Sequence, residues 1–123
     1  MSIQQAAPGG STGLSEQQIS RVFRALSDPT RRAVVAQLAL KPASMTELAR
    51  PFKMALPSFS QHLSVLEECG VVRSRKEGRV RHYQLLPQPL AAAEDWMVAQ
   101  RAIWGQRLDQ LAEYVEKMKA EES

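Results

Sequence analysis

The spacing of apolar and polar positions changes along the chain, and the changes mark out helices and one hairpin. From Pro57 to Cys69 apolar side chains recur at helical spacing, with polar side chains on the other faces. From Val72 to Gln84 the residues alternate at the period of a strand, interrupted by Glu77-Gly78. The pattern therefore predicts a helix over Pro57 to Cys69, with Gly70 just past its end, followed directly by a β-hairpin.

Two helices are predicted near the start of the chain by their capping residues. The first begins at Ser15, which fits a capping box with Gln18, and runs to about Leu26. The second has Asp28 as N-cap and Pro29 in its first turn, because proline is tolerated where no helical N–H bond is lost.

A short third helix completes a helix-turn-helix. Lys41–Ala43 is expected to be a linker, and Ser44 with Glu47 fits another capping box. The helix is expected from Met45 to about Lys53. Two short helices joined by a tight turn, the second with an exposed polar face, form this motif.

The two ends of the chain differ from this central part. Residues 1–13 are small, polar and rich in Gly and Pro, so a disordered tail is expected, with one domain over residues 14–119. One long helix is expected at about 89–119. Its apolar face is too long for a small domain to cover, which favours pairing with a second copy of the chain; packing against the first helix is the alternative. The residues expected in this contact are Met97, Trp104, Leu108, Leu111 and Val115.

Composition adds a candidate partner. Aromatic content of 6% in 123 residues favours a single, mainly helical domain. Residues 21–82 carry twelve Lys and Arg against five Asp and Glu, whereas residues 83–123 carry four against seven. This asymmetry favours a polyanion partner for the basic part, with a solvated charged surface as the alternative. The single cysteine, with no leader-like or membrane-spanning apolar stretch, leads us to expect a soluble, cytoplasmic protein.

The polar helix face and the basic hairpin together suggest binding to double-stranded DNA. Glutamine can pair with adenine, serine is permissive, and arginine or lysine holds phosphates. Recognition-helix candidates are Ser58, Ser60, Gln61, His62 and Ser64. Hairpin candidates are Arg73, Arg75, Lys76, Arg79 and Arg81. Alternatively, His62 supports the helix, and Arg73 with Arg75 forms a solvated edge that discourages strand pairing. Arg31 and Arg32 are expected to face solvent or phosphate.

Three motifs in this chain resemble those of one family. They are ALSDPTRR at residues 25–32, SQHLSVLEECGVV at 60–72 and GRVRHYQL at 78–85. Their order and spacing are similar to those of the ArsR/SmtB family of winged helix-turn-helix repressors, over residues 15–119. The resemblance implies a mainly α, dimeric fold with a small β-hairpin as the wing. It further implies an inverted-repeat operator, and a dimer contact through the first and last helices that adds Ile19 and Phe23 to the residues above.

The chain departs from the metal-sensing members that it resembles. Ser44 and Thr46 stand where their third-helix thiolates would lie, and no histidine follows His82. Soft and borderline ions require thiolate or imidazole ligands. We therefore expect no metal site and no cofactor, and a metal-independent branch of the family.

Other readings are weaker. An enzyme is disfavoured because no phosphate-binding glycine loop, serine elbow or His-carboxylate pair with a nucleophile is present. A protein-docking winged helix would carry an apolar wing, and a MarR-type regulator would have a longer one. If the protein is a repressor, an alternative role for Cys69 is a redox switch; the more common role of a free cysteine is that of a buried structural thiol. The Trp96 and Trp104 region could bind a small inducer.

Overall fold

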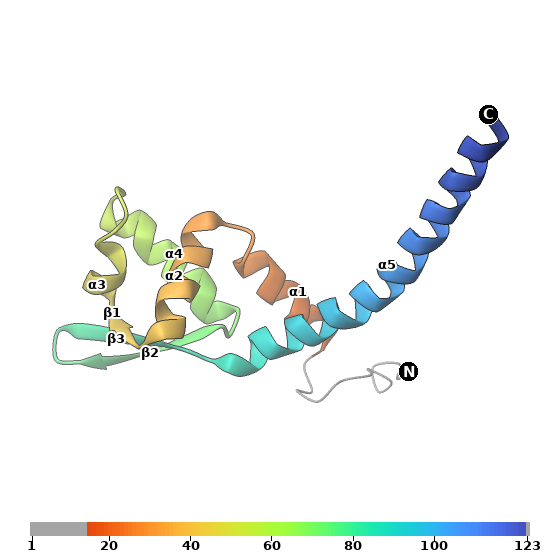
Figure 1. The fold of residues 1–123 in the computed structure, drawn as a ribbon. Helices are drawn as coiled ribbons and strands as arrows, with labels where there is room; N and C mark the ends of the chain where they lie inside the picture. The colour runs from red at the N-terminus through yellow and green to blue at the C-terminus, as the bar shows by residue number, and fades with distance from the viewer. Residues whose placement is uncertain (1–14, 123) are drawn as a thin grey trace. The chain divides into compact units, whose positions relative to one another are not determined.

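A computed structural model describes residues 15–122, and the chain divides into two compact units, with the boundary between Ala93 and Glu94. The first unit holds four helices, a small sheet and the start of a fifth helix (Figure 1). The elements in chain order are α1 (Glu16–Ala25), α2 (Pro29–Leu40), β1 (Ala43–Ser44), α3 (Met45–Ala49), α4 (Leu56–Glu68), β2 (Val72–Glu77), β3 (Val80–Leu85) and α5 (Pro87–Glu122). The expected tail at residues 1–13 lies outside the described residues.

The predicted caps are confirmed. Ser15 and Gln18 form both bonds of a capping box at α1, and Ser44 and Glu47 do the same at α3. The carboxylate of Asp28 accepts the Arg31 N–H at the start of α2. These backbone bonds lower the pKa of Asp28 and of Glu47, since each stabilises the charged carboxylate.

Helix α3 is shorter than the sequence predicted. It ends at Ala49, not near Lys53. Pro51 explains the difference, because it has no N–H to continue the helical ladder. The chain instead closes through tighter bonds from Arg50 N to Glu47 O, 3.3 Å, and from Phe52 N to Ala49 O, 3.0 Å.

The sheet holds one strand more than expected. The sequence predicts a linker and a helix cap at residues 43–44, but they form β1, which pairs antiparallel with β3 to give the order β1-β3-β2. In the hairpin Glu77 pairs with Val80, so the turn is Gly78-Arg79 rather than Glu77-Gly78. Gly78 has φ +64°, and glycine in the first central position suits a two-residue turn whose twist matches its strands.

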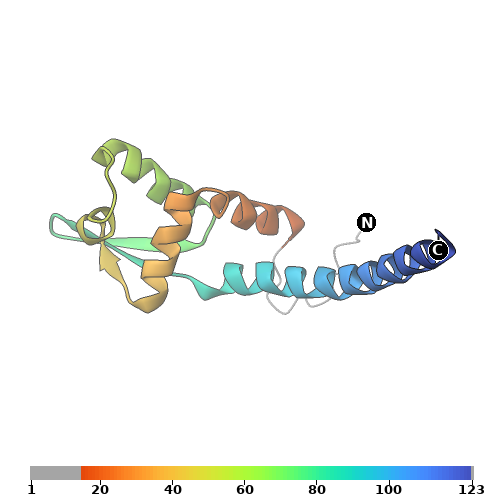
Figure 2. The same cartoon turned by 45° about the horizontal axis from the view of Figure 1, so that its top comes forward.

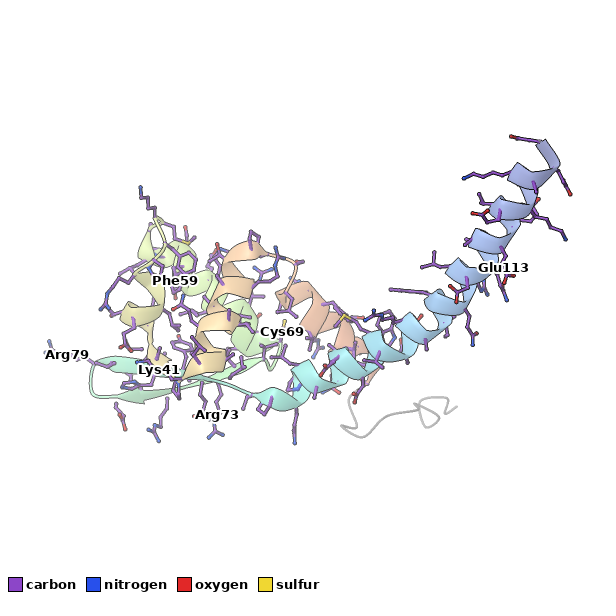
Figure 3. All side chains as sticks on the ribbon, in the orientation of Figure 1. Lys41, Phe59, Cys69, Arg73, Arg79 and Glu113 are labelled. Carbon is purple, nitrogen blue, oxygen red and sulfur yellow. The ribbon has the colours of Figure 1, made fainter. Side chains whose placement is uncertain are left out.

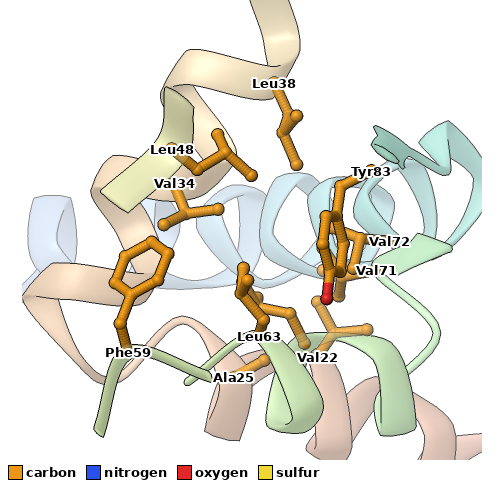
Figure 4. Packing of buried hydrophobic residues seen from close by; sticks show 12 residues of the cluster. Val22, Ala25, Val34, Leu38, Leu48, Phe59, Leu63, Val71, Val72 and Tyr83 are labelled. Carbon is orange, nitrogen blue, oxygen red and sulfur yellow. The ribbon is translucent and has the colours of Figure 1, made fainter. Parts of the chain in front are cut away.

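One hydrophobic core holds the first unit together (Figure 4). Helices α1, α2, α3 and α4 each contribute buried apolar side chains, and the sheet covers them from one side. The fully buried members with the largest side chains are Phe59, Leu48, Leu63, Leu66, Val22, Val34, Val71 and Val72. Because α4 buries Phe59, Leu63 and Leu66 on one stripe, its opposite face is left to solvent.

Helix α5 spans both units. Its first turns bury Ala92 and Ala93, and the second unit is the rest of this helix from Glu94 onward. The helix begins at Pro87 and continues to Glu122, a few residues beyond each predicted end; a proline is acceptable in a first turn. Among residues 15–122, no helix combines the length and apolarity needed to cross a membrane.

Candidate nucleic-acid interface

The recognition-helix candidates divide into exposed and half-buried positions on α4. Ser58, Gln61 and Ser64 are exposed, whereas Ser60 and His62 are half-buried. Gly70, with φ +76°, ends the helix and redirects the chain into β2. These exposed three are therefore the recognition-helix candidates that an external partner can reach.

His62 turns toward the beginning of α2. Its Nδ1 lies 3.2 Å from Arg31 Nη1 and 3.7 Å from Asp28 Oδ2. A guanidinium can only donate, so in neutral His62 the Nδ1 accepts this bond and the ring proton is on Nε2. Of the two roles considered for His62, these contacts favour support of the helix.

The two hairpin faces carry different side chains. Register places Val72 and Ser74 with Leu85 and Tyr83 on the face toward the core. Arg73 and Arg75 are exposed on the other face, and Figure 3 shows Arg73 pointing away from the helices.

The tip of the hairpin is open to solvent. Arg79 and Lys76 are exposed, and Arg79 projects from the turn (Figure 3). In both ribbon views the turn extends past the helices of the first unit (Figures 1 and 2). Arg75 pairs with Glu77 at 3.2 Å, which offsets part of the positive charge near the tip. Arg79 and Lys76 are thus the basic residues best placed to reach beyond the body of the unit.

Strand alternation alone predicts Arg79 and Arg81 on one face of the hairpin, but Arg79 lies in the turn and only Arg81 belongs to β3. Arg81 Nη1 donates to Ser74 Oγ at 2.9 Å. Ser74 Oγ in turn donates to Glu67 Oε2 of α4, also at 2.9 Å. Arg81 is therefore connected to the recognition helix through one serine. Burial, and secondarily the charge of Glu67, raise the pKa of Tyr83 beside this network.

The expectation that Arg31 and Arg32 face solvent or phosphate is wrong for Arg31, which is half-buried, whereas Arg32 is exposed as expected. Arg31 donates to Ala25 O at 2.7 Å and Arg24 O at 3.1 Å, and Arg32 donates to Leu26 O at 2.8 Å. The last carbonyls of a helix lack partners within it, and α1 ends without a glycine cap. The missing glycine after α1 was the signal in the sequence: it could have indicated that a side chain of the next helix donates to these carbonyls.

Two further basic residues were missed because they lie in the α3–α4 connection. Arg50 and Lys53 are exposed there, ahead of the α4 N-terminus. Ala55 precedes α4 and supplies no side-chain cap to its first N–H groups. The uncapped N–H groups at a helix start carry a partial positive charge and attract anions. The start of α4 and the basic hairpin therefore both favour a negatively charged partner.

The remaining candidates are the cysteine, the two tryptophans and a metal site. Cys69 is half-buried at the end of α4 and packs against the core. On α5, Trp96 and Trp104 are 37% and 52% exposed. Across residues 15–122, no group of three or more His, Cys, Asp or Glu is arranged to hold a metal ion.

The α5 part of the second unit exposes large apolar side chains along most of its length. Leu108, Leu111 and Val115 are 63%, 58% and 46% exposed, with Met97, Trp104 and Met118 on the same stripe. All the α5 residues predicted for a dimer contact are in this exposed set. Ile19 and Phe23 of α1 are half-buried, and Phe23 packs partly against the core.

Comparison with known proteins connects this geometry to a family. A family profile described as a helix-turn-helix domain matches residues 26–75. The HTH-type transcriptional regulator Rv2034 of Mycobacterium tuberculosis is 47% identical over 72 residues, which cover 58% of this chain and 67% of that protein. The transcriptional repressor SdpR of Bacillus subtilis is 31% identical over 80 residues, covering 65% of this chain and 89% of that protein.

Solved structures agree. The ArsR family transcriptional regulator RHA00566 is 44% identical, with a TM-score of 0.70, over 75% of this chain and 95% of that one. The chain belongs to the ArsR family of DNA-binding transcriptional regulators. The homodimeric winged helix-turn-helix domain of Mb0332 from Mycobacterium bovis, a possible ArsR-family regulator, is 25% identical with a TM-score of 0.59. That comparison covers 84% of this chain and 91% of that domain.

Membership in the ArsR family confirms several expectations from sequence. The mainly helical winged helix-turn-helix with its small hairpin is confirmed, as is a role in transcription regulation rather than enzymatic catalysis. Helices α3 and α4 are the two helices of the motif, and the β2–β3 hairpin is its wing.

Proposed function

We propose that this ArsR-family regulator is a homodimeric repressor that binds a two-fold-symmetric operator, with residues 14–119 as the DNA-binding and dimerisation domain. The observation that carries the proposal is the stripe of apolar side chains exposed along α5. Isolated exposed leucines are ordinary, but a continuous stripe at helical spacing marks a protein contact. The partner is a second copy, because the Mb0332 domain with the same fold is a homodimer.

In this dimer each copy reads one half-site. The α4 face with Ser58, Gln61 and Ser64 enters the major groove, flanked by Ser60 and His62, and Gln61 is the side chain suited to a base edge. Phosphates are held by the wing, by the uncapped start of α4, and by Arg50 and Lys53. The wing residues are Arg73, Arg75, Lys76, Arg79 and Arg81. Two-fold symmetry then spaces equivalent contacts by about 34 Å, or a multiple of it.

Substitutions at Gln61 and Arg79 test base reading against phosphate contact. Gln61→Ala is expected to weaken binding to the preferred duplex by about 1–3 kcal/mol, with little change on scrambled DNA. Arg79→Ala is expected to weaken both and to lower the slope of log K against log salt by about one per copy. Fluorescence anisotropy over a salt series measures both, on a duplex selected from a random pool with the wild-type protein. Equal losses on both duplexes for Gln61→Ala would contradict base reading.

We further propose that DNA release in this protein does not require a metal. The chain has one cysteine and two histidines, and His62 is already engaged by Arg31. Zinc, cadmium and arsenite, each added to the chelator-treated protein–DNA complex, are expected to leave the dissociation constant unchanged. Release by any one of them, reversed by chelator, would instead indicate a metal site built from two subunits.

A further inference from the structure

The structure assigns Arg31 as a positioning residue that fixes the recognition helix α4 relative to the end of α1. This inference rests on the proposed reading of DNA by α4. Arg31 is the first basic residue of α2 and is half-buried, so its side chain lies between helices rather than on an open surface.

The evidence is a set of three side-chain contacts, called here the Arg31 bridge. Arg31 Nε donates to Ala25 O at 2.7 Å, and Nη2 donates to Arg24 O at 3.1 Å. Nη1 lies 3.2 Å from His62 Nδ1, which accepts this bond when the imidazole is neutral and carries its proton on Nε2. One guanidinium thus joins the last carbonyls of α1 to a side chain of α4. Its rigid fork of donors can make these bonds simultaneously, which a single ammonium at the end of a flexible stem cannot do.

The backbone of Arg31 is fixed as well. Its N–H donates to Asp28 Oδ2 at 3.0 Å, and the same carboxylate oxygen lies 3.7 Å from His62 Nδ1. Asp28 therefore holds the base of the arginine side chain while the guanidinium holds the histidine. The net charge of the Asp28–Arg31 pair is zero, so the bridge neither attracts nor repels phosphate strongly.

The position of His62 on α4 makes the bridge relevant to DNA. His62 directly follows Gln61, and it lies four residues after Ser58 and two before Ser64. Helix α4 is one continuous helix of thirteen residues. A contact that holds His62 in place therefore fixes how α4 is rotated about its own axis, and with it the direction of the exposed polar face of α4. A small rotation misdirects hydrogen bonds to base edges while leaving phosphate contacts to the wing in place.

The test separates positioning from direct contact with DNA. Arg31→Ala and Arg31→Lys are compared with Arg32→Ala, the adjacent arginine that bonds to Leu26 O. On the selected duplex, Arg31→Ala is expected to lose about tenfold in affinity with an unchanged salt slope. Arg31→Lys is expected to lose nearly as much, and Arg32→Ala less than threefold. A salt slope lowered by about one, with recovery in Arg31→Lys, would show a phosphate contact and overturn the inference.

His62 supplies a second readout that does not depend on DNA. In the wild type, ¹⁵N NMR of the imidazole at alkaline pH should show Nδ1 unprotonated and accepting a bond, with one tautomer dominant. Arg31→Ala should shift that resonance toward a mixture of tautomers, and Arg32→Ala should not. An unchanged His62 spectrum in Arg31→Ala would overturn the inference whatever the DNA result.

A double-mutant cycle identifies the path of the effect. If Arg31 acts through His62, adding Arg31→Ala to His62→Gln lowers the affinity by less than a further twofold. If the two residues act independently, the fold-losses of the two single variants multiply in the double variant. Should Arg31→Ala fail to fold, Arg31→Lys and His62→Gln complete the comparison. Wild-type protein that binds no duplex better than scrambled DNA would refute the proposed function, while the NMR result would still decide the Arg31 bridge.

Discussion

Leu108→Glu is expected to convert the proposed dimer into a monomer and to abolish tight binding to a symmetric operator. Leu108 is in the middle of the exposed α5 stripe and is 63% exposed in a single copy. At a two-fold interface the substitution occurs twice, and each copy places a carboxylate in an apolar contact. Loss of a central interface residue costs about 2 kcal/mol of association free energy for each copy. The two copies together therefore raise the dissociation constant of the dimer by roughly a thousandfold.

The matched control is Gln106→Glu. It adds the same charge to the same helix, but a residue two positions away points to the opposite side. Gln106 is exposed and outside the apolar stripe, so this variant should remain dimeric. Sedimentation velocity gives the mass of each variant, and circular dichroism checks that both stay helical. A Leu108→Glu protein that remains dimeric and binds the operator normally would exclude the stripe as the dimer contact.

The loss of operator binding follows from the geometry of half-sites. A monomer can place one α4 and one wing on DNA, so it contacts about half of the phosphates and bases. In a dimer the second copy binds its half-site without paying the cost of association again. Loss of the dimer contact therefore lowers the affinity by many fold, not merely twofold. A monomeric variant should therefore bind the selected duplex only about as tightly as it binds scrambled DNA.

Sequence predicted the features of this fold that depend on near neighbours. The capping boxes at Ser15 and Ser44 and the Asp28-Pro29 helix start each need only residues three or four positions apart. The failures also have local causes. Pro51 ended α3 early, and the hairpin turn took Gly78 with Arg79 because only glycine accepts φ +64° without strain.

Partners of long side chains could not be predicted from the pattern. Arg31 and Arg81 read as basic surface residues, yet one reaches His62 on α4 and the other reaches Ser74 across the hairpin. An arginine can extend toward solvent or back to a carbonyl, and which it does depends on elements brought together by the core. The candidate interface remains a prediction from the sequence, and the structure adds which of its side chains bond to other parts of the fold.

Leu48→Ala is expected to destabilise the first unit by about 2–5 kcal/mol, a large part of the roughly 5–15 kcal/mol of a typical domain. Helix α3 has five residues, too few for a stable helix on its own, and Leu48 is its one buried side chain. Removing that side chain leaves a cavity in the core and releases the first helix of the helix-turn-helix. DNA affinity should therefore fall together with stability.

Leu40→Ala is the control with the same change of side chain. Leu40 lies at the end of α2 and is 87% exposed, whereas Leu48 is 0% exposed. Its substitution should alter the free energy of unfolding by less than about 0.5 kcal/mol. Urea unfolding followed by circular dichroism measures both variants, at one protein concentration because a dimer's stability depends on it. Tryptophan fluorescence would be the wrong probe, since Trp96 and Trp104 are both in the second unit. Equal effects at Leu40 and Leu48 would mean that burial of α3 does not hold the helix-turn-helix in place.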